Sequence, residues 1–178
     1  MFSTHIPFNS DGDLGAEYNR IMKEGGDWTL FVDHDIFLCH PHWHSVLSEI
    51  IRMRPNAGLI TCYTNRIGKT QQKHPKAPQN DDIIQHRRFA KELFETNHYR
   101  VMPISRASGM LMLVNKKAWE KVGGFQPGFF GVDWDYSKRL QKNGIEILLA
   151  TGLYVYHLYN RTEGPWIDGE KVSTSFIK

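Results

Sequence analysis

Residues 28–35 read WTLFVDHD, a short and mostly apolar run that ends abruptly in two aspartates. The run 28–32 predicts a strand that is buried on both faces. Asp33 and Asp35 follow it directly, and carboxylates in such a place are costly unless they are paired, solvated or bound to a cation. Their oxygen atoms suit Mg²⁺ or Mn²⁺. Aspartate also favours the turns that end strands, so this pattern by itself fits a plain turn equally well.

Around this stretch, segments of helical and strand character alternate along the chain. A β-prone run occupies 2–8, and further strands are expected at 58–63, 108–114 and, as one or two strands, 145–157. Helices are expected at 15–23, 42–53, 83–96, 115–123 and 133–144. The polar stretch 65–82 predicts an irregular surface loop. The alternation predicts an α/β fold, with a mainly parallel sheet flanked by helices in a compact single domain.

The composition narrows the class of protein. A chain of 178 residues with 40% hydrophobic residues can bury one sizeable core. The net charge is only +3, and the sequence lacks the dense stripe of Lys and Arg that is typical of a nucleic-acid binder. We therefore expect no nucleic-acid partner. Cys39 and Cys62 suit a reducing compartment. We find no apolar run of about 20 residues and no signal peptide opening the chain, and therefore expect no transmembrane segment and a cytoplasmic location.

Two further motifs carry groups that could do chemistry. The stretch 131–135 reads GVDWD at the start of an expected helix, where aspartates commonly cap free N–H groups. Residues two apart point in different directions on a helix, so Asp133 and Asp135 should have separate roles. His157 follows the last strand and fits either a packed or a metal-bound histidine. The spacing His40-x-His42-x-His44 also resembles a metal motif, but it straddles a helix start and favours surface or capping roles.

Taken in order, these motifs resemble the family 2 glycosyltransferases, which have the Rossmann-like GT-A fold. The resemblance covers roughly residues 28–160 and rests on WTLFVDHD, then SGMLMLVNKKAWEKVGGFQPGFFGVDWDYSKRLQKNG, then YVYHLYN. It implies a metal-dependent, inverting transfer of a sugar from a nucleotide-diphosphate sugar to an acceptor hydroxyl. Asp33, Asp35 and His157 would hold Mn²⁺ or Mg²⁺, and Asp133 would be the catalytic base. A UDP-sugar is the expected donor, and a glycan, a lipid-linked molecule or a protein the expected acceptor.

The chain departs from the family pattern in two places. Val132 stands where the acidic motif usually has Glu, and the D-x-D begins unusually early in the chain. We therefore interpret 1–27 as a shortened nucleotide-binding part, 28–160 as the D-x-D, acceptor and base region, and 161–178 as a C-terminal tail. The residues expected to bind the donor are Pro7, Phe8, Asn9, Asn19, Asp33, His34 and Arg161, and those expected to bind the acceptor are Trp134 and Asp135.

Two other functions remain open from the sequence. A haloacid-dehalogenase-like phosphatase also places D-x-D after an apolar strand and uses the first aspartate as its nucleophile. That motif normally continues with Thr or Val, where this chain has Phe37. A non-catalytic domain that binds nucleotide-sugars is the other alternative, and the short N-terminal part favours it.

Overall fold

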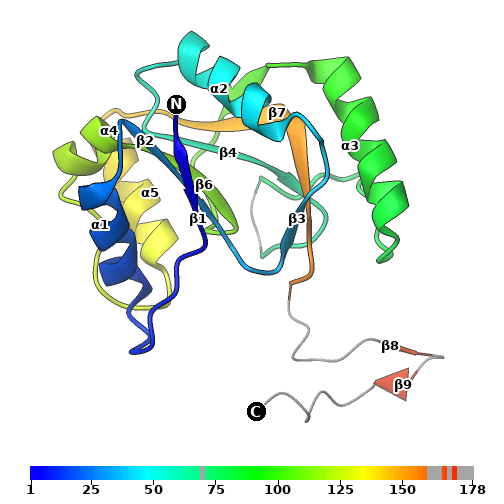
Figure 1. Cartoon of the computed structure of the whole chain (residues 1–178), viewed down its shortest axis with the longest axis horizontal. Helices are drawn as coiled ribbons and strands as arrows, with labels where there is room; N and C mark the ends of the chain where they lie inside the picture. Colours follow the sequence, from blue (N-terminus) through cyan, green and yellow to red (C-terminus); the bar gives the residue numbers. More distant parts are fainter. Residues whose placement is uncertain (69–70, 160–165, 168–169, 172–178) are drawn as a thin grey trace.

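A mixed, curled sheet forms the centre of the protein in a computed structural model that describes residues 1–68, 71–159, 166–167 and 170–171 (Figure 1). Its strands are β1 (Ser3–His5), β2 (Trp28–Val32), β3 (Ile36–Leu38), β4 (Leu59–Thr64), β5 (Val101–Pro103), β6 (Leu111–Asn115) and β7 (Ile147–His157). They run in the order β1-β2-β6-β4-β7-β3, and β5 also pairs with β7. Strands β8 (Trp166–Ile167) and β9 (Glu170–Lys171) form a separate small antiparallel pair.

The prediction of a mainly parallel sheet is wrong. Only the pairs β1/β2 and β4/β7 are parallel among the described strands of this sheet. The strand β6 lies antiparallel between β2 and β4, and β7 pairs antiparallel with both β3 and β5. The short strands β3 and β5 follow tight turns and carry too few residues for a clear apolar period, which is why the sequence did not indicate them. The chain is therefore a single compact domain of mixed α/β structure.

Helices cover both faces of this sheet, and the alternation of side chains along β2 explains how. Leu30 and Val32 point to one face and pack in the core cluster that includes Val46 of α2 (Trp43–Met53). Phe31 points to the opposite face, in a cluster with Tyr18 of α1 (Leu14–Glu24). That cluster also receives α4 (Lys116–Lys121) and α5 (Val132–Lys142), which Figure 1 shows grouped with α1. The five predicted helices are all present, the remaining one being α3 (Ile83–Asn97).

The long strand β7 extends to the end of the sheet at which the D-x-D lies. Its first half pairs with β5, and its second half pairs with β3 along the same edge. Between the halves the register with β4 shifts, and a Cβ at Gly152 would lie 2.0 Å from the carbonyl oxygen of His98. Only glycine permits this close backbone approach. The strand thus continues past β5 and brings His157 opposite Ile36, the residue that follows the D-x-D.

None of the helices in the part of the chain that the structure describes has the length and apolarity needed to cross a lipid bilayer.

Candidate functional site

The D-x-D lies at the exit of β2, in the turn before β3. The backbone N–H of Asp33 donates a hydrogen bond to the carbonyl oxygen of Met110 at 2.9 Å, which fixes the first carboxylate at the end of the sheet. Burial raises the pKa of Asp33 above its ordinary value, and the charge of Asp35 adds to this rise while His157 opposes it. A cation would therefore stabilise the ionised form of Asp33.

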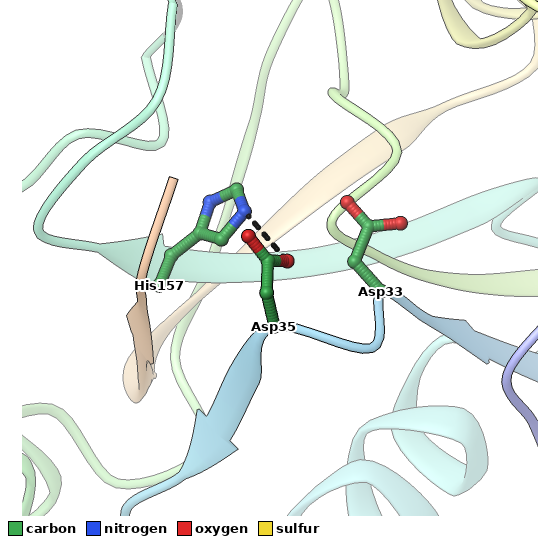
Figure 2. A group of neighbouring side chains, drawn as sticks. All are labelled: Asp33, Asp35 and His157. Carbon is green, nitrogen blue, oxygen red and sulfur yellow. Dashed lines mark ion pairs between the residues drawn. The ribbon is translucent and has the colours of Figure 1, made fainter. Parts of the chain in front are cut away.

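The imidazole of His157 is held in one orientation by the segment after β4. Its backbone N–H donates to Oδ1 of Asn65 at 2.8 Å, and its Nδ1 lies 3.0 Å from the carbonyl oxygen of Arg66. A carbonyl oxygen can only accept, so Nδ1 carries the hydrogen and the neutral ring has its lone pair on Nε2. That Nε2 lies 3.2 Å from Oδ1 of Asp35, and a dashed line in Figure 2 marks this pair. The contact is favourable only with a proton or a metal cation between the two atoms.

Asp33, Asp35 and His157 form a compact set of candidate metal ligands. Each offers one ligand atom, and these atoms lie within 4.8 Å of one another. Adjacent ligands of an octahedral ion with bonds of about 2.1 Å lie roughly 3 Å apart, close to the contact between His157 and Asp35. The backbone N–H of Tyr159 also donates to the other carboxylate oxygen of Asp35 at 3.2 Å. The side chains in Figure 2 thus present two carboxylates and one ring nitrogen to the same space.

A cavity of about 600 Å³ opens beside these ligands and collects most of the predicted site residues. Its lining includes eight of them: Pro7, Phe8, Asn9, Asp33, His34, Asp35, Asp133 and His157. They come from the segment after β1, the exit of β2, the start of α5 and the end of β7. Segments far apart in the sequence therefore meet at one cavity.

Asp133 lies in the first turn of α5, and its carboxylate is oriented by backbone donors. Its Oδ2 accepts from the N–H of Gly109 at 2.9 Å, and its Oδ1 accepts from the N–H of Trp134 at 2.8 Å. Gly109 lies just before β6, next to the peptide that holds Asp33. The negative charge of Asp133 makes a small contribution to the raised pKa of Asp33, and both residues line the cavity.

The two residues predicted to bind an acceptor lie elsewhere on α5. Asp135 forms an ion pair with Arg139, in which its Oδ2 is 2.8 Å from Nε and 2.7 Å from Nη2. Trp134 is 48% exposed, with the Lys138 ammonium 4.6 Å from its ring centroid. Neither residue lines the cavity. Asp133 and Asp135 make different contacts, in keeping with the directions that their spacing predicted, and acceptor binding by Asp135 and Trp134 stays a prediction.

Asn19, another predicted donor contact, makes packing contacts outside the cavity lining. Its amide donates to the carbonyl oxygen of Phe125 at 2.7 Å and accepts from the N–H of Phe125 at 2.8 Å and from Nε1 of Trp119 at 3.0 Å. These bonds fasten α1 to the glycine-rich stretch after α4, away from the cavity lining. The other predicted donor contact, Arg161, lies outside the described residues.

The motif of three histidines makes contacts within the protein. His40 is buried, packs on Phe94, and accepts the N–H of His42 at 3.2 Å just before α2. His44 stacks on Phe2 with ring centroids 4.4 Å apart. His42 and His44 are exposed, as the sequence favoured, whereas the prediction is wrong for His40, which is buried and caps no N–H of the helix.

Sequence reasoning missed Tyr18, which lies on α1 and lines the cavity while being almost fully buried. Burial raises the pKa of its phenol, and the charges of Asp33 and Asp133 raise it further. The hydroxyl therefore stays protonated and can donate a hydrogen bond into the cavity. An aromatic residue on the buried face of a helix looks like any core residue, so the sequence carried no signal for this position.

Comparison of the chain with protein-family models finds no match, and comparison with curated proteins finds none. Its function is therefore inferred from the cavity and from the ordered motifs around it.

Proposed function

We propose that this chain is a metal-dependent, inverting glycosyltransferase with a GT-A-like fold. It would move a sugar from a nucleotide-diphosphate sugar, with a UDP-sugar as the expected donor, to a hydroxyl group of a glycan, a lipid-linked molecule or a protein. One observation carries the proposal: Asp33, Asp35, His157 and Asp133 come from separate segments and converge on a single cavity. Each would have there the role that the resemblance to family 2 glycosyltransferases implies. The free thiols of the two cysteines agree with the proposed cytoplasmic location.

The three candidate ligands fit a divalent cation. Two carboxylates and an oriented imidazole nitrogen suit Mn²⁺, and Mg²⁺ less well because that ion prefers oxygen ligands. The hydrogen bond from Nδ1 of His157 to the Arg66 carbonyl directs Nε2 toward the site, which is the usual support for a metal-bound histidine. When bound there, the cation would neutralise the charge that develops on the leaving diphosphate.

Asp133 would accept the proton of the attacking hydroxyl. The hydrogen bond from Gly109 keeps its carboxylate facing the cavity, and both of its oxygens retain free lone pairs for an acceptor. A base on the opposite side of the sugar from the leaving group permits direct displacement with inversion. Tyr18, held neutral by burial between two carboxylates, can donate a hydrogen bond to a substrate oxygen.

The size of the cavity also supports a ligand of this class. A volume of about 600 Å³ lies within the roughly 300–1,000 Å³ that small-molecule sites usually occupy. Pro7, Phe8 and Asn9 contribute apolar and amide surface from the segment after β1, beside the acidic end of the cavity. We assign this segment to the donor.

A donor screen tests the proposal. UDP-, GDP- and dTDP-sugars are incubated with the protein and Mn²⁺, Mg²⁺ or EDTA, and the released nucleoside diphosphate is quantified. We expect release that requires the metal, increases with an added acceptor and disappears in Asp35→Ala. Asp27→Asn, which changes an exposed aspartate at the opposite end of β2, is the matched control.

Two results would contradict the proposal. Hydrolysis of p-nitrophenyl phosphate that is lost in Asp33→Asn, with no turnover of nucleotide-sugars, would instead identify a phosphatase with an aspartyl nucleophile. Binding of UDP with Mn²⁺ but no turnover in any donor and acceptor combination would identify a binding domain.

A further inference from the structure

Two phenylalanines at the edge of the cavity are exposed to an unusual degree. Phe130 is 93% exposed and Phe129 is 57% exposed, and both line the cavity. Their ring centroids lie 5.0 Å apart with the planes nearly perpendicular, at 87°. Large apolar side chains that stay exposed together beside a cavity are typical of a surface that binds a ligand.

The loop that carries these rings is fixed at its base. The N–H of Gly128 donates to Oδ1 of Asp13 at 2.8 Å, and the N–H of Gly15 donates to the carbonyl oxygen of Gly128 at 3.0 Å. A Cβ at Gly15 would lie only 1.9 Å from the carbonyl oxygen of Gln126, so the loop lies directly on the first turn of α1. The rings are thus presented from a firm support, which limits the entropy lost on binding.

The charges that line the cavity and the position of the two rings indicate which ligand the rings would contact. Phe130 precedes Asp133, the proposed base, by three residues, and both line the cavity, so we assign the rings to the acceptor. The charged lining residues among those described are aspartates, joined by His34 and His157, and they include neither Lys nor Arg. A cation bound by Asp33 and Asp35 would leave the charge of Asp133 uncompensated. This environment disfavours an anionic acceptor and favours a neutral one.

We infer that Phe129 and Phe130 form a platform for a non-reacting ring of a neutral saccharide acceptor. The flat face of an aromatic ring matches the C–H face of a pyranose, and Asp133 would receive the hydroxyl of the adjoining sugar. This inference rests on the proposed function, since it assigns the acceptor as a neutral glycan of at least two sugar units. It also replaces Trp134 as the aromatic contact with the acceptor.

Saturation-transfer NMR tests the inference without requiring sugar transfer. Cellobiose, maltose, lactose and chitobiose are each added to the protein with UDP and Mg²⁺, and glucuronic acid serves as the anionic comparison. We expect at least one disaccharide to bind, with an affinity about tenfold weaker in Phe130→Ala. Ile84→Ala, which removes an exposed apolar side chain on α3 outside the cavity lining, should bind as the unaltered chain does. UDP affinity in Phe130→Ala should stay within about twofold.

The outcomes separate this inference from the proposed function. Equal disaccharide binding in Phe130→Ala, no binding of any neutral disaccharide, or tighter binding of glucuronic acid overturns the platform. Co-sedimentation with phosphatidylcholine vesicles that is lost in Phe130→Ala, without disaccharide binding, would replace it with a lipid-binding surface. Disaccharide binding that depends on Phe130 while the donor screen gives no turnover would refute the transferase alone.

Discussion

The contact between His157 and Asp35 can be tested by removing one carboxylate charge. With Mn²⁺ at about 100 times its dissociation constant, binding to the folded state alone stabilises a protein by about 2.7 kcal/mol. For a chain of 178 residues this corresponds to a rise in Tm of about 5–11 °C. Asp35→Asn removes one of three ligands, and we expect Mn²⁺ affinity to fall about 100-fold. At the same Mn²⁺ concentration the stabilisation then drops to about 0.4 kcal/mol, or roughly 1–2 °C.

The assay is a thermal melt followed by circular dichroism, with Mn²⁺ and with EDTA. Without metal, Asp35→Asn loses a partly exposed pair with His157, so its Tm should fall by the equivalent of no more than about 1 kcal/mol. Asp27 lies at the opposite end of the same strand, so Asp27→Asn should keep the full rise in Tm with Mn²⁺. Two results would refute the metal site and leave the contact as an ion pair. One is an equal Tm of the unaltered chain in Mn²⁺ and in EDTA; the other is a rise in Tm with Mn²⁺ that is as large in Asp35→Asn as in the unaltered chain.

Three further perturbations address the base and the supports of the cavity. Asp133→Asn should lower the rate of transfer about 10²–10⁴-fold with little change in Tm or UDP affinity, whereas Asp135→Asn should lower the rate less. Steady-state kinetics of both variants measure this difference, and a larger loss of rate in Asp135→Asn would show that the two roles are assigned the wrong way round. Gly15→Ala should destabilise the fold by about 1–3 kcal/mol in urea unfolding, because its Cβ would overlap the Gln126 carbonyl, and an unchanged midpoint would contradict that contact. Hydrogen bonds from backbone N–H groups lower the pKa of Asp13, so its contribution to stability is present above about pH 4 and lost as the pH falls through the lowered pKa; Asp13→Asn should flatten the acid limb of a Tm-against-pH curve, and an unaltered limb would exclude this role.

The parts of the site that lie within one local segment could be predicted from the sequence. The apolar run of β2 and its abrupt end determine where Asp33 and Asp35 emerge, because both features depend on consecutive residues. The acidic start of α5 likewise determines that Asp133 and Asp135 point apart. The direction of a strand could not be predicted in this way, since it depends on how the chain crosses the sheet between strands. Alternation of helices and strands favoured parallel pairing, and β6 enters antiparallel nonetheless.

The stretch expected to be an irregular surface loop also contains interior residues. Asn65 and Gln72 are fully buried, and the Gln72 amide links Thr61 of β4 to the backbone of Ser108 beside the cavity. Polar residues in a stretch that also holds two prolines and several lysines are interpreted as solvated surface, because composition cannot reveal which amide will find partners in the interior. The polar character of its neighbours thus gave no sign that Asn65 would accept a hydrogen bond from the backbone N–H of His157.

The candidate metal-binding set depends on the geometry of β7 more than on any motif. His157 meets Asp35 only because β7 is long enough to pair first with β5 and then with β3, and because Gly152 lets the strand pass close to His98 between the two pairings. A strand that ended at this glycine would leave the D-x-D as a plain turn, which is how the sequence alone could also be interpreted. The same local pattern is compatible with both interpretations, and the contact with His157, more than a hundred residues distant along the chain, is what supports the proposed metal site.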